Sequence, residues 1–138
     1  MPQVTVKKIV EGDAHLVVRV VLLSDGSGDL VKEVLVSPLD LNPPRKANRT
    51  TLRIMQIWYG MSNFDAEFGF NLLTPDAAWT VAKGTDSHVD FRNFGGLMEY
   101  PTVPPEDVDG KLWLSTAGFT VAGQTGSFVL ELRKTNTP

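Results

Sequence analysis

Cysteine is absent from this sequence of 138 residues. The chain therefore has no disulfide framework, no thiolate zinc site and no thiol nucleophile, and we expect its stability to come from packing or from neighbouring subunits. Long apolar runs are absent too. None approaches the length needed to cross a bilayer, and residues 1–13 are too polar and too alternating for a signal peptide. These absences predict a protein that is made in the cytoplasm and has no membrane partner.

A basic surface is also lacking, since 13 Lys and Arg residues stand against 16 Asp and Glu residues, for a formal net charge of −3. No basic cluster is dense enough to follow a phosphate backbone, so we expect no nucleic-acid partner. The length suits a single hydrophobic core. We therefore expect one β domain over residues 1–138, with a polar tail at 135–138.

The sequence is rich in alternation with a period of two, which is the pattern of β-strands. Residues 3–10 predict a half-buried strand, with Val4 and Val6 on one face. Residues 14–23 are apolar on both faces apart from two polar residues, which predicts a central strand covered on two sides. Residues 30–36 follow a turn rich in Gly and Asp, and we expect them to return as the hairpin partner of that strand.

Residues 64–72 show the cleanest alternation in the chain. One face of this expected strand carries Phe64, Ala66, Phe68, Phe70 and Leu72, and the other carries Asp65, Glu67, Gly69 and Asn71. Further strands are expected within residues 51–60, 77–82, 88–94, 111–116 and 127–134. Short strands separated by Gly, Pro, Asp and Asn predict an all-β fold. We expect an antiparallel β-sandwich or a jelly-roll-like barrel, with two long proline-rich loops at 38–50 and 98–110.

Residues 88–97 predict a strand that ends at a corner and enters the second loop. The residues expected to face the core are Val89 and Phe91, and those expected to face solvent or a neighbour are His88, Asp90 and Arg92. Phe94 is expected to anchor the corner, and Gly95 with Gly96 would let the backbone turn sharply. This segment needs no ligand.

Few residues are candidates for chemistry. The sequence has two histidines, and His88 shares one strand face with Asp86 and Asp90, which would allow a metal site. Polar residues on a solvent face are, however, the ordinary condition of an antiparallel strand, and we favour that interpretation. The carboxylates of residues 25–29 (DGSGD) would allow a cation site, but they lack the spacing of an EF-hand loop, so a turn is favoured.

The nearest approach to a catalytic pair is Asp65 with Glu67, on the polar face of one expected strand. Glycosidases use two carboxylates of this kind. Solvated strand residues explain the pair more simply. The chain has no G-x-S-x-G elbow, no P-loop and no dinucleotide-binding motif. We therefore expect that the protein is not an enzyme and has no metal or other cofactor.

Large apolar residues at positions expected to be exposed are more informative. Trp113 lies between two leucines, so its indole should face outward if the leucines face the core. Trp58 and Tyr59 should present one ring to each face. The other interface candidates lie in the two loops and are Pro43, Pro44, Met98, Tyr100, Pro104 and Pro105. Exposed apolar patches mark contact surfaces, and proline lowers the entropy that a loop loses on binding. The alternative is that these apolar residues are buried within the molecule, because both sheets are covered or because the loops fold back onto the domain.

Three stretches carry a resemblance to a known family. They are residues 89–100 (VDFRNFGGLMEY), residues 110–134 (GKLWLSTAGFTVAGQTGSFVLELRK) and the opening residues 2–20 (PQVTVKKIVEGDAHLVVRV). Together they resemble small β-rich virion structural proteins of tailed bacteriophages, most of all head decoration, or cement, proteins. Residues 71–84 depart from the family, which has a Trp-Asp pair followed by small polar residues there.

The resemblance implies a capsid decoration protein with no catalytic residues. It implies attachment to the major capsid protein outside the head lattice, assembly with itself as a trimer, and location in the virion after synthesis in the host cytoplasm. Many weak copies would then act together. Two alternatives stay open: a tail tube, adaptor or fibre component of the phage, and a carbohydrate-binding module in which Trp113, Trp58 and Tyr59 stack on sugar rings.

Overall fold

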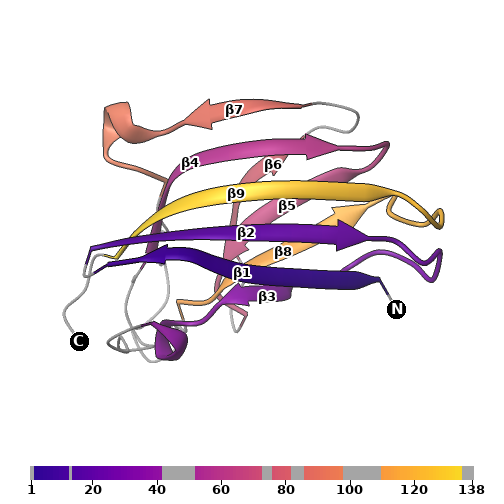
Figure 1. The fold of residues 1–138 in the computed structure, drawn as a ribbon, viewed down its shortest axis with the longest axis horizontal. Coiled ribbons are helices and arrows are strands. Elements are labelled where there is room, and N and C mark those ends of the chain that lie inside the picture. Colours follow the sequence, from indigo (N-terminus) through magenta and orange to yellow (C-terminus); the bar gives the residue numbers. More distant parts are fainter. Residues whose placement is uncertain are drawn as a thin grey trace.

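The strands of this protein form two antiparallel sheets that pack face to face (Figure 1). The computed structural model describes residues 2–12, 14–41, 52–72, 76–81, 86–97 and 110–134. The elements are β1 (Gln3–Glu11), β2 (His15–Leu23), β3 (Glu33–Val36), the 3₁₀ helix η1 (Pro38–Asp40), β4 (Leu52–Met61), β5 (Asp65–Phe70), β6 (Asp76–Val81), β7 (Asp86–Asp90), the 3₁₀ helix η2 (Arg92–Phe94), β8 (Leu112–Ala117) and β9 (Thr125–Lys134). One sheet has the order β1-β2-β9-β4-β7, and the other has the order β3-β8-β5-β6.

The strand pairs are nested along the chain. β2 pairs with β9, β3 with β8, β4 with β7 and β5 with β6. Pairing of β9 with β4 and of β8 with β5 completes the two sheets. A nested antiparallel ribbon wrapped into two sheets is the jelly-roll arrangement, here with β1 added at one edge. The predicted all-β fold is therefore confirmed, and the sandwich has jelly-roll topology.

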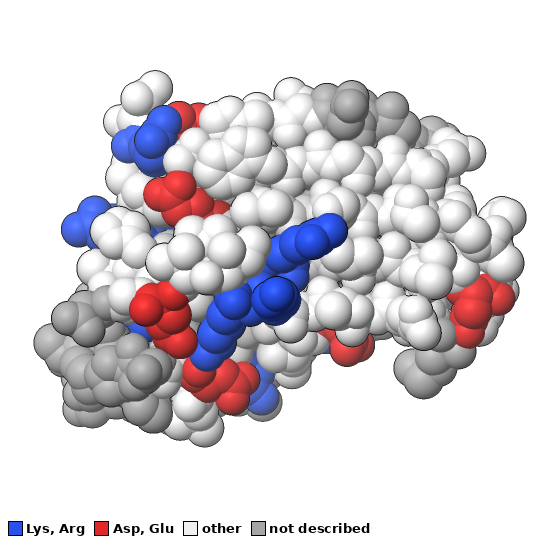
Figure 2. Space-filling view, viewed as in Figure 1, with Lys and Arg blue, Asp and Glu red and all other residues white. Residues whose placement is uncertain are grey.

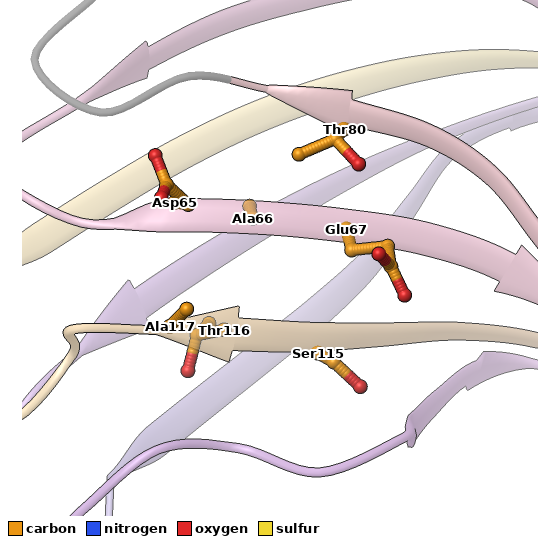
Figure 3. Close-up of a pocket in the computed structure, with 7 residues that line it drawn as sticks. All are labelled: Asp65, Ala66, Glu67, Thr80, Ser115, Thr116 and Ala117. Atoms are coloured by element: carbon orange, nitrogen blue, oxygen red, sulfur yellow. The ribbon is translucent and has the colours of Figure 1, made fainter.

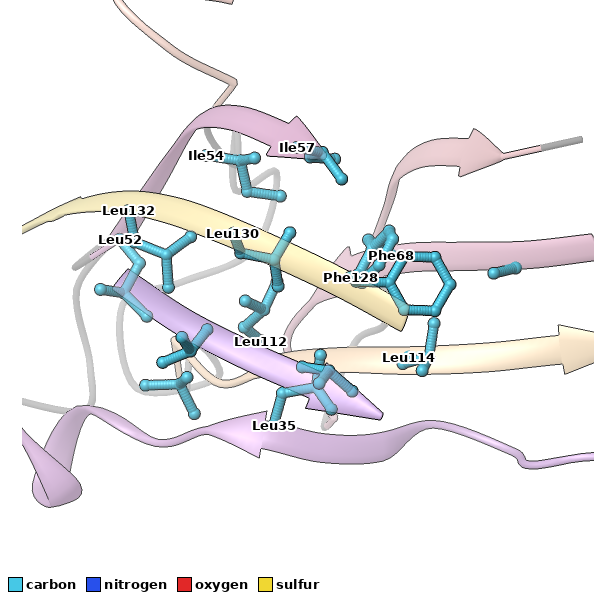
Figure 4. Close-up of a cluster of buried hydrophobic side chains, with 14 of the residues drawn as sticks. Leu35, Leu52, Ile54, Ile57, Phe68, Leu112, Leu114, Phe128, Leu130 and Leu132 are labelled. Carbon is cyan, nitrogen blue, oxygen red and sulfur yellow. The ribbon is translucent and has the colours of Figure 1, made fainter. Parts of the chain in front are cut away.

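The hydrophobic core lies between the sheets and follows from alternation along each strand. The five-stranded sheet contributes fully buried residues from two central strands, which are Leu16, Val18, Val20 and Leu22 of β2 and Phe128, Leu130 and Leu132 of β9. The four-stranded sheet contributes Leu35, Phe68, Leu112 and Leu114 from the opposite side (Figure 4). The alternation predicted from residue 64 is confirmed as far as Phe70, because Phe64, Ala66, Phe68 and Phe70 are all buried. Leu72, predicted on the same face, lies after the end of β5 and is half-buried.

β2 is central in its sheet, but only one of its faces is covered. On the outer face Arg19 and Leu23 are exposed, and Val17 and Val21 are half-buried. The prediction of cover on two sides is therefore wrong. No described strand packs on this outer face, because the four-stranded sheet lies on the opposite, core side.

The predicted hairpin between residues 14–23 and 30–36 is also wrong, because β2 and β3 belong to different sheets and β3 pairs with β8. The connecting segment crosses from one sheet to the other and binds both the end of β8 and the β8–β9 connection. Ser24 N–H donates to Gln124 O at 2.9 Å, and Leu30 N–H donates to Thr116 Oγ1 at 2.9 Å. The residues typical of a turn are present, but they lie in a segment that crosses between the two sheets.

β1 is a strand, as predicted, and lies at an edge of the five-stranded sheet. Val4 and Val6 share the inward face, since their register partners are Leu22 and Val20. Val4 is half-buried against the core and Val6 is exposed. The register shifts between Lys8 and Val10, so the strand carries a bulge near its end, which is a common device at sheet edges.

The corner predicted at residues 94–96 is present, although the strand expected within residues 88–94 ends at Asp90, and η2 follows. Val89 is half-buried and Phe91 is buried, whereas His88, Asp90 and Arg92 are exposed, so these predicted orientations are confirmed. The side chain of Phe94 lies outside the described residues. Gly95 and Gly96 have φ values of 83° and 95°, in the left-handed region that favours glycine.

Candidate functional site

The described residues that flank both predicted loops lie at one end of the sandwich. Leu97 forms a β-bridge with Ile54 near the start of β4, and Leu52 is paired with Lys134 at the end of β9. Figure 1 shows η1, η2 and the C-terminal end of β9 on this same side, at the left. We call this region the loop end and define it as residues 8–12, 38–41, 52–54, 91–97, 110–111 and 134.

Asn71 fixes the entry to β8 at the loop end. Its backbone has a φ of 66°, and its side chain is buried although alternation placed it on the polar face. The backbone N–H of Asn71 donates to Lys111 O at 2.9 Å, and its Oδ1 accepts from Gly110 N–H at 2.8 Å. Asparagine tolerates the left-handed region, so its position after an alternating strand was the available signal for this role.

A second anchor ties three segments of the loop end together through Glu11. Lys134 Nζ, which is buried, donates to Glu11 Oε2 at 2.8 Å and to Gly12 O at 2.8 Å. Lys8 Nζ bonds Glu11 Oε1 at 3.2 Å and also donates to Asp40 O. The buried ammonium is thus compensated by a carboxylate and a carbonyl, and the ends of β1 and β9 are joined to η1.

Exposed apolar side chains accompany these anchors. Leu39 on η1 is 66% exposed, and Ile9 and Val10 at the end of β1 are exposed as well. The contact between Lys8 and Asp40 brings the two elements together, so these side chains belong to the same region. The loop end therefore combines a fixed backbone with apolar groups that remain in solvent.

Trp113 is the clearest error among the predicted interface residues. It lies on the outer side of its sheet, as alternation requires, but only 1% of it is exposed. Its Nε1–H donates to Asn71 O at 2.8 Å, and Lys32 Nζ lies 5.9 Å from the ring centroid. Segments distant in sequence therefore cover the indole, which removes it as a platform for any partner.

Trp58 and Tyr59 face opposite sides of the five-stranded sheet, as predicted. Tyr59 packs against the core, while Trp58 is 39% exposed on the outer face. The ring of His88 on β7 stacks on the indole, with centroids 4.8 Å apart and planes 9° apart. The remaining interface candidates, Pro43, Pro44, Met98, Tyr100, Pro104 and Pro105, lie outside the described residues.

A chain of hydrogen bonds holds this aromatic pair. Gln56 Oε1 lies 2.7 Å from His88 Nε2, and Gln56 Nε2 donates to Glu131 Oε2 at 2.6 Å. Gln56 and Glu131 are not among the residues that the sequence predicts for a site. The reason is a shift in register between Ile54 and Gln56, which places Gln56 beside Trp58 on the outer face and leaves Ile54 and Ile57 in the core.

Two of the three side chains that would ligate a metal at residues 86–90 are bound to other residues of the chain. His88 is bound to Gln56, and Asp90 is held by Arg92, with 2.7 Å from Arg92 Nη2 to Asp90 Oδ2. These hydrogen bonds from Arg92 lower the pKa of Asp90 to about 2. The side chain of Asp86 lies outside the described residues. In the described part of the chain, no three His, Asp or Glu side chains are placed to hold a metal.

The carboxylates of Asp65 and Glu67 lie on the outer face of the four-stranded sheet, in a shallow hollow of about 300 Å³. Thr80, Ser115 and Ala117 also line it (Figure 3). Figure 3 shows the two carboxylates pointing to opposite sides of β5, so they do not converge on a common bond. This arrangement lacks the facing carboxylates of a glycosidase.

The carboxylates of residues 25–29 serve the backbone. Asp25 Oδ1 accepts from Ser27 N–H at 2.9 Å within the turn. Asp29 Oδ1 accepts from Phe119 N–H at 2.7 Å and from Thr116 Oγ1 at 3.1 Å. Asp29 therefore points toward the β8–β9 connection, and the two carboxylates do not share one site.

Comparisons with known proteins add little to this geometry. Within the described residues no helix is long and apolar enough to cross a membrane. No family model matches the sequence, and no curated protein is significantly similar to it. One solved structure, described as "Structure of infectious bursal disease virus Gx strain", is similar with 16% identity and a TM-score of 0.36 over 97% of this chain. The chain spans 31% of that protein's length, and so weak a likeness gives no information on function.

Proposed function

We propose that this chain is a non-enzymatic structural protein of a virion, a capsid decoration protein that binds the head lattice through its loop end. One observation carries the proposal. The jelly-roll topology brings the flanks of both proline-rich segments to the same end, beside the exposed side chains of Leu39, Ile9 and Val10. An end with apolar groups on a fixed backbone is suited to contact with another protein.

The resemblance of residues 89–100 and 110–134 to phage decoration proteins supports the same role. In the structure these residues include the corner at Gly95, the contact of Gly110 with Asn71 at the loop end, and the two strands β8 and β9. The partners in this proposal are the major capsid protein and further copies of the chain, assembled as a trimer. Each contact can be weak because many copies bind one particle.

The rival within the virion is a tail tube, adaptor or fibre component. Copy number separates the two. A decoration protein is expected in hundreds of copies per particle and remains on tailless heads, whereas a tail component is lost with the tail.

The attachment surface is tested with purified heads stripped of the protein and incubated with variants. Leu39→Asp places a charge at the loop end, and we expect it to weaken head binding by roughly tenfold or more, because the loss is repeated over many contacts. Val121→Asp is the matched control. Val121 is 64% exposed, close to the 66% of Leu39, but it lies in the β8–β9 connection at the other end of the sandwich. Equal binding of both variants and the wild type would overturn the proposed attachment.

A further inference from the structure

The outer face of the five-stranded sheet divides into a charged part and an uncharged part. Figure 2 shows charged side chains over the left and centre of this face, and a broad uncharged region toward the upper right. The C-terminal half of β4 and the N-terminal half of β9 run toward that side in Figure 1. Trp58 belongs to this half of β4, and it is the largest exposed apolar side chain on the face.

The indole of Trp58 lies nearly parallel to the imidazole ring of His88. Its stacking distance of 4.8 Å from His88 equals the spacing of neighbouring strands, and the two residues are register partners. His88 therefore covers one face of the indole. β9 lies on the other side of β4 from β7, and the register partner of Trp58 on β9 is Val129.

A hollow of about 380 Å³ opens beside the indole. It is lined by Trp58, Tyr59, Gly60, Ser87, Ser127 and Val129. Gly60 has no side chain and Ser127 has a small one, so the space beside the ring stays open. None of these described lining residues is charged, and Ser127, on the same face of β9 as Val129, offers a hydroxyl.

The stacked pair of Trp58 and His88 is also held in place by other residues of the chain, so it is ordered before a ligand binds. Gln56, itself buried, links His88 to Glu131 through the two hydrogen bonds described above. His88 in turn supports the indole by stacking. A side chain that is already ordered loses less conformational entropy on binding, so a shallow site gains affinity from this support.

We infer that the hollow beside Trp58 is a binding subsite for one ring of a neutral saccharide. A pyranose has an apolar face of C–H groups that packs on an indole, and a rim of hydroxyls that exchanges hydrogen bonds with serine. The lining matches both features, and none of the residues that line the hollow is charged. The inference does not depend on the proposed function, because the subsite lies on the sheet face and not at the loop end.

The test uses the three tryptophans of the chain as reporters, one for each environment. Their indole N–H signals are assigned in proton–nitrogen correlation spectra through single Trp→Phe variants. The protein is then titrated with glucose, galactose, mannose and N-acetylglucosamine, and with maltotriose, cellotriose and chitotriose. We expect a saturable shift of the Trp58 signal with at least one of these probes, with a dissociation constant on the order of 1 mM for a single ring.

The other two tryptophans are internal controls. Trp79 is 38% exposed, nearly the same as Trp58, but it lies on β6 and forms a T-shaped pair with Phe91. Trp113 is buried. Neither signal should shift, and Trp79→Ala should bind as the wild type does.

A variant that fills the hollow tests whether binding requires the hollow as well as the indole of Trp58. Ser127→Leu occupies the hollow at an exposed position and leaves Trp58 in place, and we expect it to abolish the saturable shift while the remaining spectrum is kept. The inference is overturned if no probe produces a saturable Trp58 shift, if Trp79 shifts equally, or if Ser127→Leu binds like the wild type.

Discussion

Replacement of Trp113 tests the packing of the four-stranded sheet most sharply, because sequence alternation and the structure disagree on this residue. Its indole is fully buried and its Nε1–H is bound to Asn71 O at 2.8 Å. Trp113→Ala removes this buried volume and the hydrogen bond, and large-to-small changes of this kind cost about 3–5 kcal/mol. Small domains are stable by about 5–15 kcal/mol, so the variant should lose a large part of its stability.

The assay is urea unfolding followed by circular dichroism, with Trp58→Ala as the comparison. Trp58 is half-exposed and stacked on His88, so its loss should cost about 1 kcal/mol or less. Trp113→Phe keeps most of the ring and should lie between the two, at about 1–3 kcal/mol. If Trp113→Ala is no more destabilising than Trp58→Ala, the indole is not covered in solution and the structural reasoning fails.

Two further predictions concern the corner after β7. Arg92→Ala should raise the pKa of Asp90 from about 2 toward the ordinary value of 3.8, as measured by a carbon-detected pH titration of the carboxyl group. Because the pKa of Asp90 is lowered in the folded protein, the stabilisation by the Asp90–Arg92 pair is present above about pH 4 and is lost as pH falls toward 2. If Asp90 titrates at the same pH in the variant as in the wild type, Arg92 is not the cause of its lowered pKa. Gly96→Ala should destabilise the protein by about 1–3 kcal/mol in urea unfolding, since its φ is 95° and an added Cβ would lie 2.6 Å from Met55 Sδ. Gly123→Ala is the control, because its φ is similar, at 93°, but no atom lies within 4 Å of the added Cβ; equal losses in the two variants would rule out a steric contribution at Met55.

The strands could be predicted from the sequence because each one alternates on its own. Phe64, Ala66, Phe68 and Phe70 are buried where period two places them, and Val89 and Phe91 follow the same rule. The partners of the strands could not be predicted in this way. Residues 24–29 have the composition of a hairpin turn, yet the segment crosses between the sheets because its hydrogen bonds are made to residues near 116–124.

The candidate sites, like the strands, could be predicted where local alternation decides the outcome and could not be predicted where distant segments decide it. Alternation placed Trp58 and Tyr59 on opposite faces of one strand, and the structure agrees. It also placed Trp113 outward, but the cover comes from Asn71 and Lys32, which are about 40 and 80 residues away in sequence. The support of His88 by Gln56 depends on a bulge in β4 that has no clear sequence signal. Long-range contacts, rather than the local alternation of the sequence, therefore decide which aromatic side chain on the outer face of a sheet is exposed to a partner.

The central claim is that this chain works by adhesion through its loop end, and imaging of the native particle by electron cryomicroscopy tests it most directly. The account predicts many copies on the head exterior, arranged with the symmetry of the lattice, with η1 and the corner at Gly95 turned toward the capsid surface. Copies confined to the tail, or copies on the head with the β8–β9 connection facing the capsid and the loop end in solvent, would contradict it.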